Sequence, residues 1–133
     1  MRVYLGGPVD PASLDICLQW RLDAEALLAA HSMTAVNPCR DGRHPVARDD
    51  GKITGMPVPP HELVRRDKAD IRSCQALLVY WPAETAKRGI GTTMEIALAG
   101  EWSIPVILVD PGGQVADHPW VQVYVTERHS DID

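Results

Sequence analysis

The amino-acid sequence predicts an α/β fold, in which a mainly parallel sheet of about five strands carries helices on both faces. Short apolar runs that are typical of buried strands alternate with longer segments in which apolar residues recur every three or four positions, the period of a helix. Glycine or proline follows most of the strand-like runs. This alternation is typical of parallel sheets, because each strand is joined to the next by a helix that crosses one face.

The first two strands and the helix between them are expected near the N-terminus. Residues 2–5 form a short apolar run that stops at Gly6-Gly7-Pro8. Residues 12–32 have the helical period, and residues 35–36 form a second short strand that Asn37-Pro38 closes. These elements predict a strand–helix–strand unit at the start of the sheet.

Residues 39–60 show no period, because glycine and proline recur throughout and should prevent any regular element. A loop of this length in a compact domain is usually a functional lid or a disordered segment. Its many charged side chains could close over a polar ligand, or they could simply be solvated.

The second half of the chain continues the alternation. A helix is expected over residues 61–73, a strand over 76–81, a helix from the region of Glu95 to about Trp102, and a strand over 104–109. Residues 120–125 alternate and are expected to form the last strand, with a short helix as the alternative.

Length and charge restrict the class of protein. A chain of 133 residues suits one domain over residues 1–133, and with 45% hydrophobic residues but no phenylalanine its core should be aliphatic. The net charge of −5 at pH 7 argues against binding to a nucleic-acid polymer, which requires a basic face. A single nucleoside or nucleotide is not excluded, since a few local groups suffice to bind it.

The three cysteines, Cys17, Cys39 and Cys74, lie far apart, and the histidines lack the spacing of metal ligands. We therefore expect neither a disulfide framework nor a metal site, and no cofactor is implied. The chain has no leader-like N-terminal pattern and no apolar run near the roughly 18 residues of a membrane span. A cytoplasmic protein without membrane partners is expected.

The most informative segment is residues 89–99, which follow a strand and a loop. Its glycines allow close approach of a ligand, and its threonines can cap the start of a helix. Glu95 is then expected in the first turn, where the helix dipole favours an ionised carboxylate. Such a glutamate could be a nucleophile or a base, or it could merely favour the dipole.

Two further side chains could take part in chemistry. On the 61–73 helix, Asp67 lies one turn from Leu63 and one turn from Ile71, so a carboxylate falls on the apolar face. That position indicates either function or an ion pair with Arg65 or Arg66. Tyr4 in the first strand could hydrogen-bond a carboxylate, or it could be a core tyrosine.

Two carboxylates and a tyrosine around a glycine-lined pocket fit glycosidic chemistry. One carboxylate attacks or stabilises the anomeric carbon, and the other handles a proton on the leaving group. The leaving group could be a sugar or a nucleobase, and the residues alone do not choose between them.

Three segments, in order, resemble the nucleoside 2-deoxyribosyltransferase family, including its nucleotide N-glycoside hydrolase relatives. Residues 3–8 (VYLGGP) resemble its opening YLAGP strand and loop. Residues 66–79 resemble its aspartate-bearing helix and the following strand, and residues 91–99 (GTTMEIALA) resemble its GTxxEIGxA segment. The likeness covers roughly residues 2–109, and the ordered set is more specific than each motif alone.

The resemblance implies a small flavodoxin-like (Rossmann-like) three-layer fold and cleavage of an N-glycosidic bond. Glu95 would be the nucleophile at C1′ of a 2′-deoxyribosyl unit, Asp67 would serve the departing base or the sugar hydroxyls, and Tyr4 would orient Glu95. The active form would be a homo-oligomer, a dimer or larger, in which a neighbour lends residues such as Asp117, His118 or Trp120. The substrate-binding residues would be Gly6, Gly7, Pro8, Gly91, Met94 and Arg88.

The chain also departs from the family. Gly89 stands where transferases often carry an aspartate that binds the base, and Lys87 and Arg88 precede it. These cations could hold a 5′-phosphate or be solvated. The substrate would be a small (2′-deoxy)nucleoside or its 5′-monophosphate, with transfer to another base or to water. The alternatives are a non-catalytic nucleotide-binding module and a phosphoribohydrolase of the lysine decarboxylase-like type. That type carries Pro-Gly-Gly directly before its Gly-Thr pair, where this chain has Arg88-Gly89-Ile90.

Overall fold

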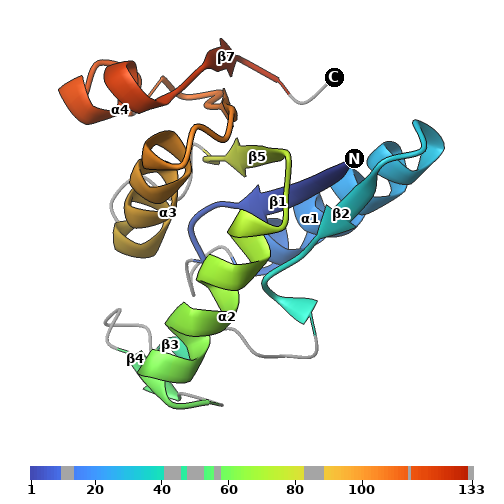
Figure 1. Cartoon of the computed structure of the whole chain (residues 1–133), viewed down its shortest axis with the longest axis vertical. Coiled ribbons are helices and arrows are strands. Elements are labelled where there is room, and N and C mark those ends of the chain that lie inside the picture. Colours follow the sequence, from blue (N-terminus) through green and yellow to red (C-terminus); the bar gives the residue numbers. More distant parts are fainter. Residues whose placement is uncertain are drawn as a thin grey trace.

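A computed structural model describes residues 1–9, 14–40, 46–47, 53–55, 58–82, 89–113 and 115–131. Its centre is a five-stranded sheet with the strand order β2-β1-β5-β6-β7, in which all neighbouring strands run parallel (Figure 1). The predicted parallel sheet is therefore confirmed. The strands of this sheet are β1 (Arg2–Gly6), β2 (Thr34–Val36), β5 (Ala76–Tyr80), β6 (Val106–Val109) and β7 (Glu127–His129).

Helices cover both faces of the sheet. Side chains alternate along each strand, so apolar side chains project from both faces and each face needs a covering layer. Val3 and Leu5 of β1 point to the face where Trp20 of the first helix packs, whereas Tyr4 points to the opposite face with Ile71. In Figure 1, α1 lies behind β1 and α2 lies in front of it. The result is the predicted three-layer, Rossmann-like arrangement. The helices are α1 (Leu14–Ala30), α2 (Pro60–Arg72), α3 (Ile90–Glu101) and α4 (Pro119–Tyr124).

The carboxyl ends of β1 and β5 meet at one edge of the sheet, where Gly6 pairs with Val79. The chain then turns at Gly7, whose φ is 155°. A Cβ atom at Gly7 would lie 2.5 Å from the carbonyl oxygen of Tyr80, which no real side chain tolerates. The sequence therefore needs glycine here, and the turn after β1 packs tightly against the end of β5.

The prediction of a last strand over residues 120–125 is wrong, and the alternative of a short helix is correct. This segment forms α4, and the last strand β7 follows it. Proline occupies the start of α4, and the Nδ1 atom of His118 accepts a hydrogen bond from the backbone of Trp120 at 3.3 Å. Val121 is buried while Val123 is exposed, so alternation in so short a segment did not distinguish a helix from a strand.

Residues 39–60 also differ from expectation, since they contain two short strands, β3 (Val46–Ala47) and β4 (Ile53–Gly55). These strands pair in an antiparallel hairpin with an irregular register. Backbone pairing therefore supplies order that glycine and proline were expected to prevent. The remaining charged residues that were predicted to close over a ligand, from Asp41 to Lys52, lie outside the described residues.

None of the helices in the described ranges combines the length and the apolar character that a bilayer crossing requires.

We expect Gly7→Ala to lower the free energy of unfolding by about 1–3 kcal/mol, because alanine is strained at this φ and its Cβ meets a backbone oxygen. Gly91→Ala is the matched control. Gly91 lies in α3 with nothing within 4 Å of an added Cβ, so alanine should raise that free energy by up to about 1 kcal/mol. Urea denaturation measures both, and equal stability of Gly7→Ala and the unmodified protein would contradict the packing described here.

Candidate active site

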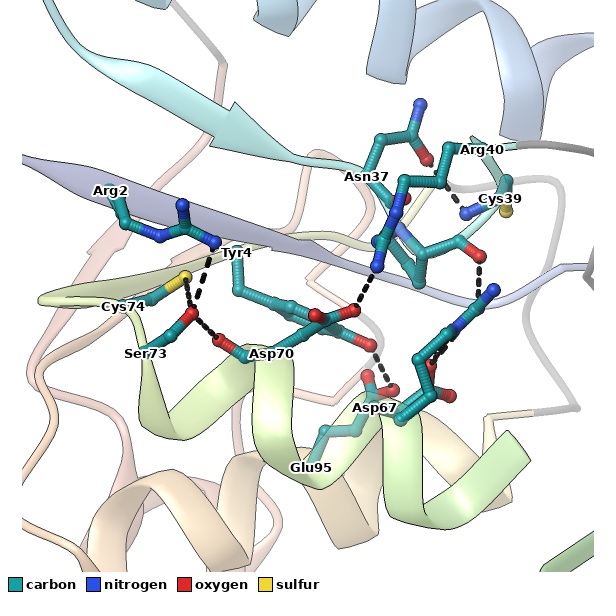
Figure 2. Close-up of polar contacts among 12 residues, drawn as sticks. Arg2, Tyr4, Asn37, Cys39, Arg40, Asp67, Asp70, Ser73, Cys74 and Glu95 are labelled. Atoms are coloured by element: carbon teal, nitrogen blue, oxygen red, sulfur yellow. Dashed lines mark hydrogen bonds and ion pairs between the residues drawn. The ribbon is translucent and has the colours of Figure 1, made fainter. Parts of the chain in front are cut away.

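The structure brings together the three side chains that the sequence singled out for chemistry, from three different elements. Tyr4 reaches from β1 to Glu95 of α3, and Asp67 of α2 lies beside this pair (Figure 2). The Tyr4 hydroxyl donates a hydrogen bond to the Oε1 atom of Glu95 at 2.8 Å. Tyr4 itself has no exposed surface, so its phenol is fixed by the surrounding core.

Glu95 does not lie in the first turn of its helix, and that prediction is wrong. The helix α3 begins at Ile90, with Gly89 as its N-cap and no side-chain cap, so Glu95 lies in the second turn. The Thr93 hydroxyl donates to the carbonyl oxygen of Ile90 rather than capping the start. Because the dipole effect falls off within one turn, the state of the Glu95 carboxyl depends mainly on burial and on its neighbours.

Those neighbours act in opposite directions on Glu95. Burial raises the pKa of Glu95 from its ordinary 4.5 to about 7, and the hydrogen bond from Tyr4 is the largest of the influences that lower it. Within this net value of about 7, the charge of Asp67 raises the pKa of Glu95 and the charge of Arg21 lowers it. The carboxyl group therefore changes its protonation near neutral pH, and such shifted carboxyl groups are typical of catalytic sites.

Asp67 forms the ion pair with Arg66 that one interpretation of its position predicted, and it also influences Glu95. Its Oδ1 atom accepts hydrogen bonds from the Nη2 and Nε atoms of Arg66 at 3.2 and 3.3 Å. Burial nevertheless raises the pKa of Asp67, while the cation of Arg66 lowers it. The charge of Asp67 in turn raises the pKa values of Tyr4 and Glu95. The carboxylate therefore forms one electrostatic unit with the Tyr4–Glu95 pair.

Arginines of two elements tie α2 to the segment that follows β2. Arg66 donates from Nη2 to the carbonyl oxygen of Pro38 at 2.5 Å. Figure 2 shows the second contact, in which Arg40 pairs with Asp70 at 2.7 Å. The amide of Asn37 accepts from the backbone of Cys39 at 2.8 Å, which turns this segment toward α2. These contacts hold Asp67 in place, and the sequence motifs did not indicate them.

The end of β1 contributes room as well as a hydrogen-bond donor. A Cβ atom at Gly6 would lie 3.3 Å from the Oε2 atom of Glu95, so glycine leaves the carboxylate free of a neighbouring side chain. Pro8 is buried behind the turn. Beneath that turn lies Arg21, whose Nη2 atom donates to the carbonyl oxygen of Gly7 at 2.8 Å. The sequence analysis missed Arg21, although it shares the buried face of α1 with Cys17 and Trp20.

The other residues that were expected to bind substrate lie elsewhere. Gly91 and Met94 are exposed on α3, and Met94 lines an apolar groove of about 410 Å³ between α3 and α4. His118 and Trp120 line the same groove, whereas Asp117 is exposed on the loop before α4. Arg88, with Lys87, lies outside the described residues. Within the described ranges, no group of histidine, cysteine, aspartate and glutamate could hold a metal ion.

Three solved structures share this fold. The 2-deoxyribosyltransferase of the psychrotolerant bacterium Bacillus psychrosaccharolyticus matches with a TM-score of 0.72 at 17% identity, over 98% of this chain and 87% of that chain. The Leishmania mexicana 2-deoxyribosyltransferase matches with a TM-score of 0.58 at 16% identity, over 81% and 63% of the two chains. A conserved protein from Enterococcus faecalis V583 matches with a TM-score of 0.64 at 11% identity, over 98% and 91%. At these identities the likeness shows a common fold. No protein-family model and no curated protein matches the chain.

The position of Glu95 predicts an unusual dependence of stability on pH. The folded protein holds the Glu95 proton up to about pH 7, whereas the unfolded chain releases it near 4.5. Between these values the folded state binds more protons, so the unmodified protein should lose stability as the pH rises. Between pH 4.5 and about 7, the free energy of unfolding of the unmodified protein should fall by up to about 3 kcal/mol relative to that of Glu95→Gln. Denaturation of both proteins across this range measures it, and a difference that is independent of pH would contradict the burial of this carboxyl.

Proposed function

We propose that this protein cleaves the N-glycosidic bond of (2′-deoxy)nucleosides or their 5′-monophosphates, with Glu95 as the nucleophile. The deoxyribosyl group is then transferred to another base or to water. The observation that carries the proposal is the part-buried hydrogen bond from Tyr4 to Glu95, with a second carboxylate, Asp67, electrostatically coupled to both. The fold shared with two 2-deoxyribosyltransferases supports the same chemistry.

In the first step, an oxygen of the ionised Glu95 attacks C1′ and forms an ester as the bond from C1′ to the base nitrogen breaks. The base leaves with the electron pair of that bond and takes up a proton that Asp67 relays, and burial raises the pKa of this aspartate above its ordinary value. Tyr4 fixes the attacking carboxylate through its hydrogen bond. In the second step, an acceptor base or water attacks C1′, its proton passes to Asp67, and Glu95 is released.

The substrate-binding part of the proposal rests on the turn after β1. Gly6, Gly7 and Pro8 would line the sugar side of the pocket, since Gly6 adjoins the Glu95 carboxylate. Gly91, which lies in the first turn of α3, would also contact the substrate. Arg88, together with Lys87, would hold a 5′-phosphate, a role proposed from sequence alone.

We also propose that residues 1–133 form a single domain. The exposed apolar face of α3 and α4 favours a homo-oligomer of this domain as the active form. Met94 and Trp120 are 63% and 64% exposed beside the groove between these helices, and contact with a second copy would cover them. A neighbour would then bring groups such as Asp117 or His118 toward the substrate. The three free cysteines suit a reducing compartment, so we propose the cytoplasm.

The activity is tested by chromatography of purified protein incubated with deoxynucleosides and their 5′-monophosphates, with and without a second free base. A new nucleoside that forms only with added base indicates transfer, and free base with free sugar or sugar phosphate indicates hydrolysis. We expect Glu95→Ala to lower the rate at least about 10³-fold, because the covalent step is lost. Glu101→Ala, at the exposed end of α3, is the control and should keep full activity. Retention of activity in Glu95→Ala would exclude the mechanism.

We expect Tyr4→Phe to move the acidic limb of kcat/KM to higher pH. The hydrogen bond from Tyr4 lowers the pKa of Glu95, so its loss raises that pKa and leaves less of the nucleophile ionised below about pH 7. Tyr124→Phe removes an exposed hydroxyl that binds Glu101 and should leave the pH profile unchanged. A Tyr4→Phe profile identical to that of the unmodified enzyme would show that this hydrogen bond does not control the nucleophile.

A further inference from the structure

A buried arginine lies beneath the candidate site without a carboxylate in direct contact. Arg21 of α1 is 1% exposed, and its guanidinium donates to the carbonyl oxygens of Cys17 and Gly7. Its Nε atom has no hydrogen-bond partner, and no carboxylate in the described part of the chain forms an ion pair with it. A buried cation is costly when unpaired, and arginine does not lose its charge in proteins. This position therefore requires a compensating interaction.

The turn after β1 separates this cation from the Glu95 carboxylate. A Cβ atom at Gly7 would lie 3.5 Å from the Nη2 atom of Arg21, and one at the adjacent Gly6 would lie 3.3 Å from the Oε2 atom of Glu95. The two charged groups thus lie against neighbouring residues of one turn. The charge of Arg21 lowers the pKa values of Glu95, Tyr4 and Cys39, so its field reaches both partners of the Tyr4–Glu95 hydrogen bond.

We propose that Arg21 is a positioning residue, which fixes the Gly6-Gly7 turn against Glu95 and supplies the buried positive charge that favours the ionised carboxylate. Among the described residues, the charged or titratable groups that influence the pKa of Glu95 are Tyr4 from β1, Asp67 from α2 and Arg21 from α1. Of these, Arg21 alone is cationic, so it opposes both burial and the negative charge of Asp67. The kinetic consequences of this inference rest on the function proposed above, whereas its electrostatic consequences do not.

Two substitutions separate the charge of Arg21 from its hydrogen bonds. Arg21→Gln removes the charge but keeps an amide that can donate to the carbonyl oxygen of Gly7. Arg21→Lys keeps the charge on a group that cannot donate to both carbonyl oxygens in the same fork. Arg128→Gln, on the exposed edge strand β7, is the control for the loss of one positive charge. Thermal unfolding first establishes which variants are folded.

The pKa of the Glu95 carboxyl is measured by carbon-13 NMR, with the signal assigned by its absence in Glu95→Gln, and kcat is measured against pH. We expect Arg21→Gln to raise the pKa of Glu95 by about one unit and to move the acidic limb of kcat by the same amount. Below that limb, kcat should fall about ten-fold. Arg128→Gln should leave both values unchanged.

An unchanged pKa of Glu95 in folded Arg21→Gln would overturn the inference. If Arg21→Gln does not fold, the dependence of kcat on pH in Arg21→Lys tests the inference instead. We expect its acidic limb to stay in place while kcat falls at least about ten-fold, because the turn is no longer held in register. Unmodified kcat in Arg21→Lys would then overturn the inference. If the unmodified protein turns over no nucleoside, the proposed function fails, and the NMR titration still tests the charge of Arg21 by itself.

Discussion

The hydrogen bond between the Tyr4 hydroxyl and the Glu95 carboxylate is the interaction on which the candidate site depends. It joins the centre of the sheet to α3, and it links the fully buried Tyr4 side chain to the partly buried carboxylate of Glu95. A carboxylate in such a place needs a partner, because an unpaired buried charge is costly. Burial and the neighbouring negative charge of Glu95 raise the pKa of Tyr4, so the phenol keeps its proton and remains the donor.

The remaining charges of the site are arranged in pairs of opposite effect. Asp67 makes ionisation of Glu95 more costly, and Arg21 makes it less costly. Arg66 offsets part of the burial of Asp67 and is itself held by the carbonyl oxygen of Pro38. Two carboxyl groups that influence each other in this way lose their protons in separate steps, so the pair as a whole holds one proton over part of the pH range.

Hydrophobic periodicity was sufficient to predict the parallel sheet and its helices, because each face must bury a different set of side chains. It also identified Asp67 as a candidate site residue, because a carboxylate on an apolar helix face is unusual. The same criterion applied to α1 would have found Arg21. Tertiary packing determined what periodicity could not. The N-cap of α3 is glycine, Gly89, because a Cβ atom there would lie 2.1 Å from the Trp81 ring, a constraint that no local pattern contains. The six residues of α4 were too few to distinguish two periods.

The most direct test of the central claim is mass spectrometry of the protein after incubation with a 2′-deoxy-2′-fluoronucleoside. The fluorine destabilises the cationic transition state at C1′ and should slow release of the covalent ester relative to its formation. We predict a mass increase equal to one fluorinated deoxyribosyl group, located on the peptide that contains Glu95 and absent from Glu95→Gln. Release of base with the sugar attached to another residue, or with no covalent product at any time, would contradict the assignment of Glu95 as the nucleophile.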